Sequence, residues 1–364
     1  MPKLELDMDY NYDEPDKVEG PRAFGRYLLL DAIYQTTGAK VYRARTIDKD
    51  ISKFLAVKIF SVEASRRQEY RQIYLSQLKN TFHLSHPGVV TISDYGMIDQ
   101  QLFVAMEYID GRNLQQIIEQ LSQDKKVLPI PVSLFIASKL CETLFYAHTF
   151  QNKFTGNMSP IIHQRVSSGN VMLSNDGYVK LMNFGMATGE MDDFVDVTSI
   201  QQEELQKIES QEKNYVSYLA PEYLGKEEID PRFDQFSVAV IIWELITGNK
   251  LFPGNTTQEI LAKIIQSDVP LPSQFNAEAH LELDQIIMKG LSTRRELRYD
   301  SIQTMNQHLI RYLQKNYPSF NPSDLRGVNF AIFKTQIRQD RALMIRLGQI
   351  DVSSYMEKSK AQQE

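Results

Sequence analysis

The chain has 364 residues, enough for one large domain or two smaller ones with their own cores. Its net charge of -6 leaves no basic excess to neutralise phosphates, so we expect no nucleic-acid partner. The single cysteine, Cys141, excludes an internal disulfide. The sequence shows no apolar core of signal-peptide length and no apolar stretch long enough for a membrane span. We therefore expect a cytoplasmic protein that does not span a membrane.

The first part of the chain divides into a tail and a strand-rich region. Residues 1–22 are rich in Asp and Glu and poor in aliphatics, which is typical of a disordered tail. From residue 23 to 108, short β-rich runs are separated by polar turns. These runs cover residues 26–34, 39–45, 54–60, 86–96 and 101–108. One amphipathic helix over residues 64–84 interrupts them. Its apolar stripe is Tyr70, Ile73, Tyr74 and Leu78.

Helices dominate from residue 109 onward. The predicted helices cover residues 114–121, 132–150, 233–247, 259–265, 281–291 and 301–313. A small strand-rich part followed by a larger helical part indicates the α+β class. Residues 317–364 hold one more candidate helix, with Ser323 as N-cap and an apolar stripe of Phe330, Phe333 and Ile337. Docking of this helix onto its own domain and binding of a partner both remain open.

Several short motifs follow one another in a specific order. They are AVK ending at Lys58, HP at 86–87, MEY at 106–108, HQR at 163–165, NFG at 183–185, APE at 220–222 and FDQFS at 233–237. In this order they resemble the protein kinase family over residues 24–312, and in particular the bacterial Ser/Thr kinases of eukaryotic type. The resemblance implies a bilobal fold, with an antiparallel β lobe and one helix at 23–108, a helical lobe at 109–316 and an activation segment at 183–222.

The nucleotide side of the site is degenerate when compared with the family. Phosphoryl transfer needs a Gly-rich cover over the phosphates, but the family's glycines fall at Tyr34, Thr36 and Ala39. Lys58 matches the phosphate-binding lysine, whereas Gln77 stands where the family has its glutamate partner. The resemblance also implies an adenine pocket. Its residues would be Val41, Ala56, Glu107, Tyr108 and Met172.

The catalytic loop shows the decisive loss. Arg165 stands where the family has the aspartate that accepts the proton of the substrate hydroxyl, and a guanidinium cannot act as a base. The metal aspartate is replaced by Asn183, so Asn170 and Asn183 would have to hold Mg²⁺ as neutral amides beside a cation. We therefore regard Mg²⁺ as a poor fit. A turn-stabilising role for Asn170 remains an alternative.

Residues that support the fold are retained. The resemblance implies that His163 and Phe184 stack, with Gly185 completing that motif, and that Asp234 braces the catalytic loop. It also implies a buried ion pair between Glu222 and Arg298. Fold residues are thus kept while residues for chemistry are lost.

The segment between Asn183 and Glu222 is long and begins acidic. Its acids are Glu190, Asp192, Asp193 and Asp196. The pattern of residues 201–210 is compatible with a helix. We hypothesise that this segment folds over the site and pairs with Arg165; an exposed mobile loop is the alternative.

Our leading interpretation is a pseudokinase that binds a protein partner as a signalling scaffold or allosteric regulator and requires no cofactor. One alternative is a divergent ATP-dependent protein Ser/Thr kinase. Another is a sensor that binds ATP or ADP through Lys58 and the adenine pocket without turnover. In the leading interpretation we expect weak or absent nucleotide binding, with ATP as a possible ligand.

Overall fold

The computed structural model describes residues 21–35, 38–47, 53–153, 155–184, 213–225, 228–352 and 355. For residues 69, 70, 73, 80, 213 and 214, the description covers the backbone alone. The chain forms two compact units. Unit 1 comprises residues 1–67, 94–108 and 346–364, and unit 2 comprises residues 68–93 and 109–345. Each unit is described below by itself.

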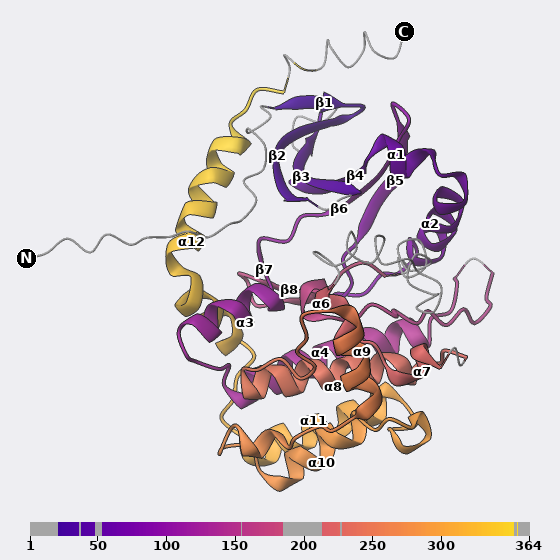
Figure 1. Cartoon of the computed structure of the whole chain (residues 1–364). Coiled ribbons are helices and arrows are strands. Elements are labelled where there is room, and N and C mark those ends of the chain that lie inside the picture. The colour runs from indigo at the N-terminus through magenta and orange to yellow at the C-terminus, as the bar shows by residue number, and fades with distance from the viewer. Residues whose placement is uncertain are drawn as a thin grey trace, which may run out of the picture. The chain divides into compact units, whose positions relative to one another are not determined.

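Unit 1 is built on a six-stranded sheet with the order β1-β2-β3-β4-β6-β5 (Figure 1). The strands are β1 (Arg22–Phe24), β2 (Tyr27–Gln35), β3 (Ala39–Thr46), β4 (Leu55–Phe60), β5 (Ile92–Ile98) and β6 (Gln101–Glu107). The predicted β-rich runs are confirmed, although the fourth begins only at Ile92. Neighbouring strands from β1 to β4 pair antiparallel, as do β4 and β6.

Alternation along β3 and β4 divides the side chains of this sheet between two faces. The core of one face is formed by Phe24, Tyr27, Leu29, Tyr42, Ala44, Val57, Ile59, Phe103 and Ala105. Val41 pairs with Lys58, and Arg43 pairs with Ala56. Directly paired residues have side chains on the same face of a sheet, so these four side chains lie together on the face opposite that core.

The helix predicted over residues 64–84 is two helices. α1 (Val62–Arg66) ends at Arg67, whose φ of −68° and ψ of 101° are extended, and α2 (Gln68–Thr81) follows. Ser61 caps α1 by accepting a hydrogen bond from the backbone N–H of Ala64. Of the predicted apolar stripe, Tyr74 and Leu78 are buried. The side chains of Tyr70 and Ile73 lie outside the described residues.

Unit 2 contains the six helices predicted after residue 109. They are α3 (Leu114–Gln123), α4 (Ile130–His148), α8 (Arg232–Thr247), α9 (Thr257–Gln266), α10 (Leu281–Gly290) and α11 (Ile302–Asn316). Local signals set their ends: Asn113 and Gln116 form a capping box at α3, and Gly248 ends α8 with a left-handed φ of 69°. The short helices α6 (Lys213–Val216) and α7 (Pro221–Leu224) lie between them.

A small sheet in unit 2 was not predicted. Its strands are β7 (Gly111–Asn113), β8 (Val171–Ser174) and β9 (Val179–Leu181), in that order. Both neighbouring pairs are antiparallel. Strands of three or four residues are too short to show a clear alternation in sequence.

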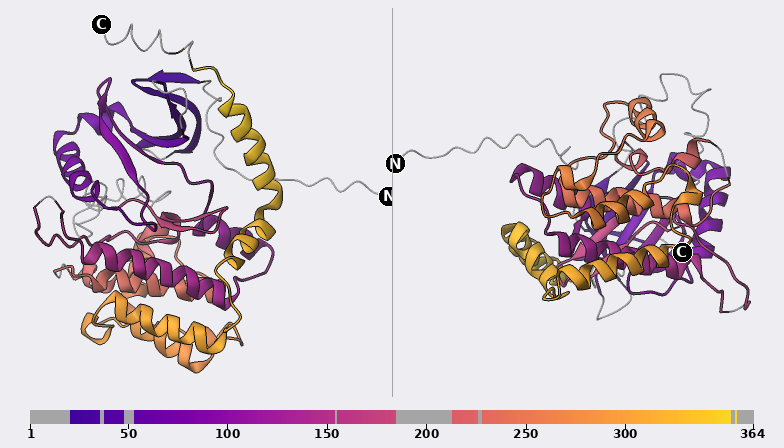
Figure 2. Two further views of the ribbon diagram at one scale, coloured as in Figure 1. Left: turned by 180° about the vertical axis from the view of Figure 1, so that it is seen from behind. Right: turned by 90° about the horizontal axis from the view of Figure 1, so that it is seen from below.

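Helices α4 and α8 form the centre of unit 2, with α10 and α11 packed beside them (Figure 2). Every residue of α8 from Phe233 to Thr247 is buried, which explains its apolar sequence. In the described part of the chain, α4 is the one helix long and apolar enough to cross a bilayer. Most of α4 is buried inside unit 2, as expected of a core helix.

The predicted C-terminal helix docks onto its own domain, which is one of the two alternatives left open by the sequence. This helix, α12 (Asp324–Gly348), carries a kink at Phe333, and Phe333 and Ile337 are buried in the core of unit 2. Phe330 is 42% exposed, so its assignment to the buried stripe is wrong. Leu325 and Asn329, each four residues from the next buried position, complete the stripe instead. From Arg346 onward the chain belongs to unit 1.

Candidate functional site

The predicted site residues fall in both units. Val41, Ala56, Lys58, Glu107 and Tyr108 lie in unit 1. Gln77, His163, Arg165, Asn170, Met172, Asn183, Phe184, Glu222, Asp234 and Arg298 lie in unit 2. Thr36, Gly185 and the acidic residues Glu190, Asp192, Asp193 and Asp196 lie outside the described residues, as does the helix predicted at 201–210. Lys58 and Gln77, the predicted partners, therefore belong to different units.

In unit 1, three of the predicted nucleotide-binding residues, Val41, Ala56 and Lys58, share one face of the sheet, whereas Glu107 pairs with Leu55 and lies on the opposite face. Lys58 lies on β4 between Val41 of β3 and Val104 of β6, and its Nζ is 4.8 Å from the centroid of the Phe60 ring. Tyr34 stands at a position where the family has glycine, and it is 59% exposed. A large side chain at this position supports the prediction that the loop cannot cover phosphates in the family's manner.

Sequence reasoning missed a buried charge on the same face. Arg43 is only 5% exposed, and its guanidinium lies 5.0 Å from the centroid of the Tyr108 ring. Its Nε is 3.7 Å from Oδ1 of Asp31, too far for a hydrogen bond. Burial raises the pKa of Asp31, partly offset by the charge of Arg43. The sequence could have indicated this position, because Arg43 follows Val41 by two residues in a strand and therefore lies on the same face of the sheet as Val41 and Ala56.

In unit 2, the catalytic loop is held by a fully buried carboxylate. Asp234 accepts hydrogen bonds from the backbone N–H groups of His163 and Gln164, each at 2.9 Å, and from Nε2 of His148 at 2.8 Å. Burial alone would raise the pKa of Asp234, but the hydrogen bond and charge of His148, aided by His163, lower it overall. Asp234 is therefore an ionised brace whose two oxygens are already engaged, and it is not available as a base.

Arg165 packs against an aromatic ring. Its guanidinium carbon is 4.9 Å from the centroid of the Tyr215 ring, a cation–π contact. The Tyr215 hydroxyl donates to the carbonyl of Gln164 at 2.6 Å. Burial raises the pKa of Tyr215 well above its ordinary value, partly offset by the charge of Arg165, so the hydroxyl keeps its proton and remains a donor. The position of the family's base thus holds a cation fastened to a neighbouring aromatic residue.

We expect the substitution Tyr215→Phe to lower the free energy of unfolding by about 1 kcal/mol, because it removes the hydrogen bond to Gln164 but keeps the ring over Arg165. Urea denaturation measures this change. The control Tyr178→Phe alters a hydroxyl on a side chain that is 62% exposed and should change the stability little. Equal effects in both variants would contradict a structural role for the Tyr215 hydroxyl.

The two predicted metal ligands are hydrogen-bonded to each other. Nδ2 of Asn183 donates to Oδ1 of Asn170 at 2.8 Å, and Nδ2 of Asn170 donates to the carbonyl of Arg165 at 2.7 Å. Asn183 has a left-handed φ of 63°, which Asn tolerates. Within the described ranges, no group of three or more His, Cys, Asp or Glu residues could hold a metal ion. These amides do not fit a hard dication, which prefers carboxylate ligands.

His163 connects the loop to the motif that follows β9. Its ring lies 4.4 Å from the ring of Phe184, and its Nε2 is 2.8 Å from the carbonyl of Met182. Burial lowers the pKa of His163 to about 4, so the ring is neutral at pH 7 and donates to that carbonyl. Met172, the predicted adenine contact of this unit, lies on β8 opposite Asn113 and Lys180.

Two clusters of polar side chains hold residues 218–222, at the start of α7, in unit 2. Glu222 and Arg298 form a bidentate ion pair with two contacts of 2.7 Å. Tyr218 donates to Glu244 at 2.5 Å, and Lys250 contacts both residues. The second cluster was not predicted. Glu244 is a buried residue of the mostly apolar helix α8, and no local sequence pattern reveals its partners.

Comparison with known proteins places this arrangement in a family. The model of the protein kinase domain matches residues 31–310. The chain belongs to the protein kinase domain family. The kinase domain of Mycobacterium tuberculosis PknI has the same fold, with a TM-score of 0.58 at 22% identity over 79% of this chain and 96% of that one.

Curated relatives of this kinase-domain protein are named as serine/threonine-protein kinases and as a tyrosine-protein kinase. Serine/threonine-protein kinase PknB of Mycobacterium leprae is 26% identical over 80% of this chain and 43% of its own length. Tyrosine-protein kinase MasK of Myxococcus xanthus is 22% identical over 80% of this chain and 44% of its own length. The chain therefore spans less than half the length of these relatives.

Proposed function

We propose that this kinase-domain protein is a pseudokinase, which acts by binding a protein partner as a signalling scaffold or allosteric regulator. The observation that carries the proposal is Arg165 packed on Tyr215 at the position of the catalytic base. A guanidinium stays protonated at every physiological pH and cannot accept the proton of an attacking hydroxyl. The nearby carboxylate of Asp234 is engaged by three donors and cannot replace the base.

The second candidate is a divergent protein Ser/Thr kinase, and the family relationship favours it over the first. Relatives such as PknB of Mycobacterium leprae are named as Ser/Thr kinases, and Lys58 is retained. Members of the kinase family ordinarily use ATP and Mg²⁺, so the prediction that no cofactor is required rests on Arg165, Asn170 and Asn183 alone. A third candidate, a nucleotide sensor, would bind ATP or ADP without turnover. The cytoplasmic location and the lack of a nucleic-acid partner stay predictions.

Two measurements on the purified chain separate these candidates. A thermal-shift titration with ATP, with and without Mg²⁺ or Mn²⁺, reports nucleotide binding, because a ligand of the folded state raises the melting temperature. Transfer of label from the γ-phosphate to the chain itself or to a generic protein reports catalysis. We expect no transfer, and any ATP-induced shift should not depend on Mg²⁺. Transfer that decreases in the variant Lys58→Ala would overturn the pseudokinase proposal and establish the second candidate.

A repaired variant tests the physical cause. The double substitution Arg165→Asp and Asn183→Asp restores a base and a metal ligand at the two lost positions. Gain of Mg²⁺-dependent binding or transfer in this variant would attribute the inactivity to these two residues. The single variant Arg165→Lys, which keeps the positive charge, serves as the matched control and should remain inactive.

A further inference from the structure

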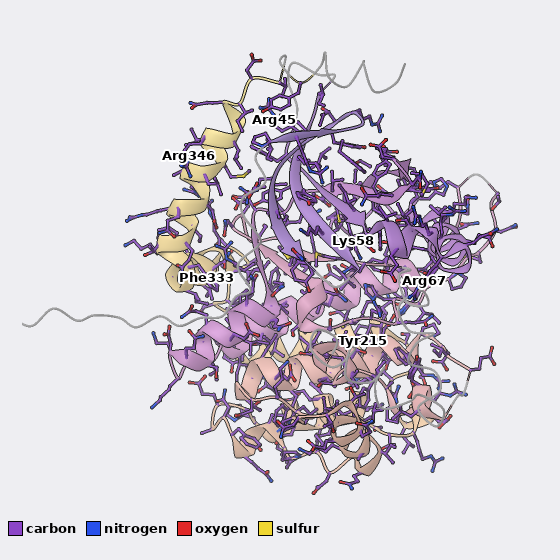
Figure 3. The ribbon with its side chains drawn as sticks, turned by 45° about the horizontal axis from the view of Figure 1, so that its top comes forward. Arg45, Lys58, Arg67, Tyr215, Phe333 and Arg346 are labelled. Atoms are coloured by element: carbon purple, nitrogen blue, oxygen red, sulfur yellow. The ribbon has the colours of Figure 1, made fainter. Side chains whose placement is uncertain are left out.

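Residues 346–352 and Tyr355, near the C-terminus, lie on the sheet of unit 1. The guanidinium of Arg45 on β3 donates to the carbonyl oxygens of Gly348 at 2.9 Å and Ile350 at 3.3 Å (Figure 3). Carbonyls at the C-terminal end of a helix lack partners within the helix and carry partial negative charge. Arg45 therefore caps the end of α12 with a charge of the favourable sign.

Apolar contacts continue from this cap. Leu28, Leu30 and Ile47 of unit 1 are buried, with exposures of 0%, 2% and 3%. The side chains packed against them come from Ala23 and Phe54 and, from the end of the chain, Leu347, Ile350, Val352 and Tyr355. The C-terminal residues themselves are only partly buried. The contact thus covers a small apolar surface with a short segment, which is the kind of contact that opens locally at low free-energy cost.

Helix α12 is anchored in unit 2 before it reaches this surface. The buried Asn329 donates to Oδ1 of Asn175 at 2.8 Å. Arg112 forms an ion pair with Asp340, and its guanidinium lies 5.6 Å from the centroid of the Phe333 ring. One continuous stretch of chain is thus fastened to unit 2 up to Asp340 and to unit 1 from Leu347 onward. This stretch lies beyond the residues that the kinase-domain model matches.

We propose that residues 346–352 together with Tyr355 are a latch. Docked through Arg45 and the apolar surface of Leu28, Leu30 and Ile47, the latch ties α12 to unit 1 and limits the movement of unit 1 relative to unit 2. Released, it exposes this surface and no longer ties α12 to unit 1. The latch is independent of phosphate transfer, so its failure would leave the proposed function untouched.

The first experiment follows hydrogen exchange in the full chain. The variant Arg45→Met removes two hydrogen bonds to the latch, and a chain ending at Ile345 removes the latch itself. We expect amides of β2 and β3 to exchange about tenfold faster in both variants, while α10 and α11 are unchanged. Arg346→Met, an exposed position, is the matched control and should exchange like the parent. Unchanged exchange in β2 and β3 would overturn the docking.

The second experiment separates docking from tethering. Spin labels at Met97→Cys in unit 1 and Ile265→Cys in unit 2, both exposed positions, report the distribution of distances between the units. We expect a broader distribution in Arg45→Met and in the chain ending at Ile345. Adding a peptide of residues 346–364 to that shorter chain should restore slow exchange in β2 and β3 but not the narrow distribution. Equal widths with and without the latch would overturn the tether.

Discussion

Replacing Arg298 with methionine should lower the free energy of unfolding by about 3–5 kcal/mol, because it leaves the carboxylate of Glu222 buried without its partner. Both side chains are almost fully buried, at 0% and 3% exposure. Arg298 also donates to the carbonyls of Ser292 and Arg232, each at 2.9 Å, so the substitution removes their partner as well. Equilibrium urea unfolding at pH 7 measures the loss.

Two further variants test this explanation. Arg232→Met breaks an ion pair with Asp230 whose side chains are 30% and 28% exposed, and it should cost about 0–1 kcal/mol. The double variant Arg298→Met with Glu222→Leu removes both buried charges and should recover part of the loss. If Arg298→Met cost no more than Arg232→Met, the buried pair would not be a major determinant of stability.

Lowering the pH from 6.5 to 4 should destabilise the protein by up to about 3 kcal/mol through His163 alone. Burial lowers the pKa of this imidazole from 6.5 to about 4 in the folded state. Between these values the unfolded chain binds a proton that the folded chain does not, so the free energy of unfolding falls as the pH falls. The folded and unfolded pKa values differ by about 2.5, and a pKa difference of one corresponds to about 1.36 kcal/mol, which gives the expected loss of up to about 3 kcal/mol.

The pH profile of urea denaturation checks this prediction. The variant His163→Gln should lose most of the slope between pH 6.5 and 4, whatever its stability at pH 7, whereas His280→Gln at an exposed position should keep it. His86, whose pKa burial also lowers, adds a smaller slope in the same range. The ionised carboxylate of Asp234 also contributes to the free energy of unfolding, but its pKa in the folded state lies below 3.8. This contribution is lost only at lower pH, where the carboxylate becomes protonated. A parental slope in His163→Gln would exclude the proposed cause.

The long elements could be predicted from the length and polarity of their segments. Helices α4 and α8 are examples, since apolar residues fill most of their 19 and 16 positions and such segments are longer than strands. Local sequence patterns failed at two places. The extended Arg67 divides one predicted helix into two, and the buried stripe of α12 runs through Asn329 instead of Phe330.

Some features of the candidate site could likewise be predicted from the sequence, and others could not. The loss of a base at Arg165 and of a metal ligand at Asn183 could be read directly, because a side chain's charge and donor set belong to the residue itself. The acidic residues predicted to pair with Arg165 lie outside the described residues, and the contact with Tyr215 of the same segment was not predicted. Tyr215 is 50 positions later in the chain, and only folding brings its ring to the guanidinium.

The sequence by itself therefore determined the kinase-like order of elements and the absence of the family's acid–base and metal groups, since these depend on periodicity and residue type. Only the tertiary structure decided how the remaining polar groups are held: Arg165 on Tyr215, Asn183 on Asn170, and the end of α12 on Arg45. Each of these contacts joins residues distant in sequence. Their geometry is set by the packing of whole elements, and no local pattern records it.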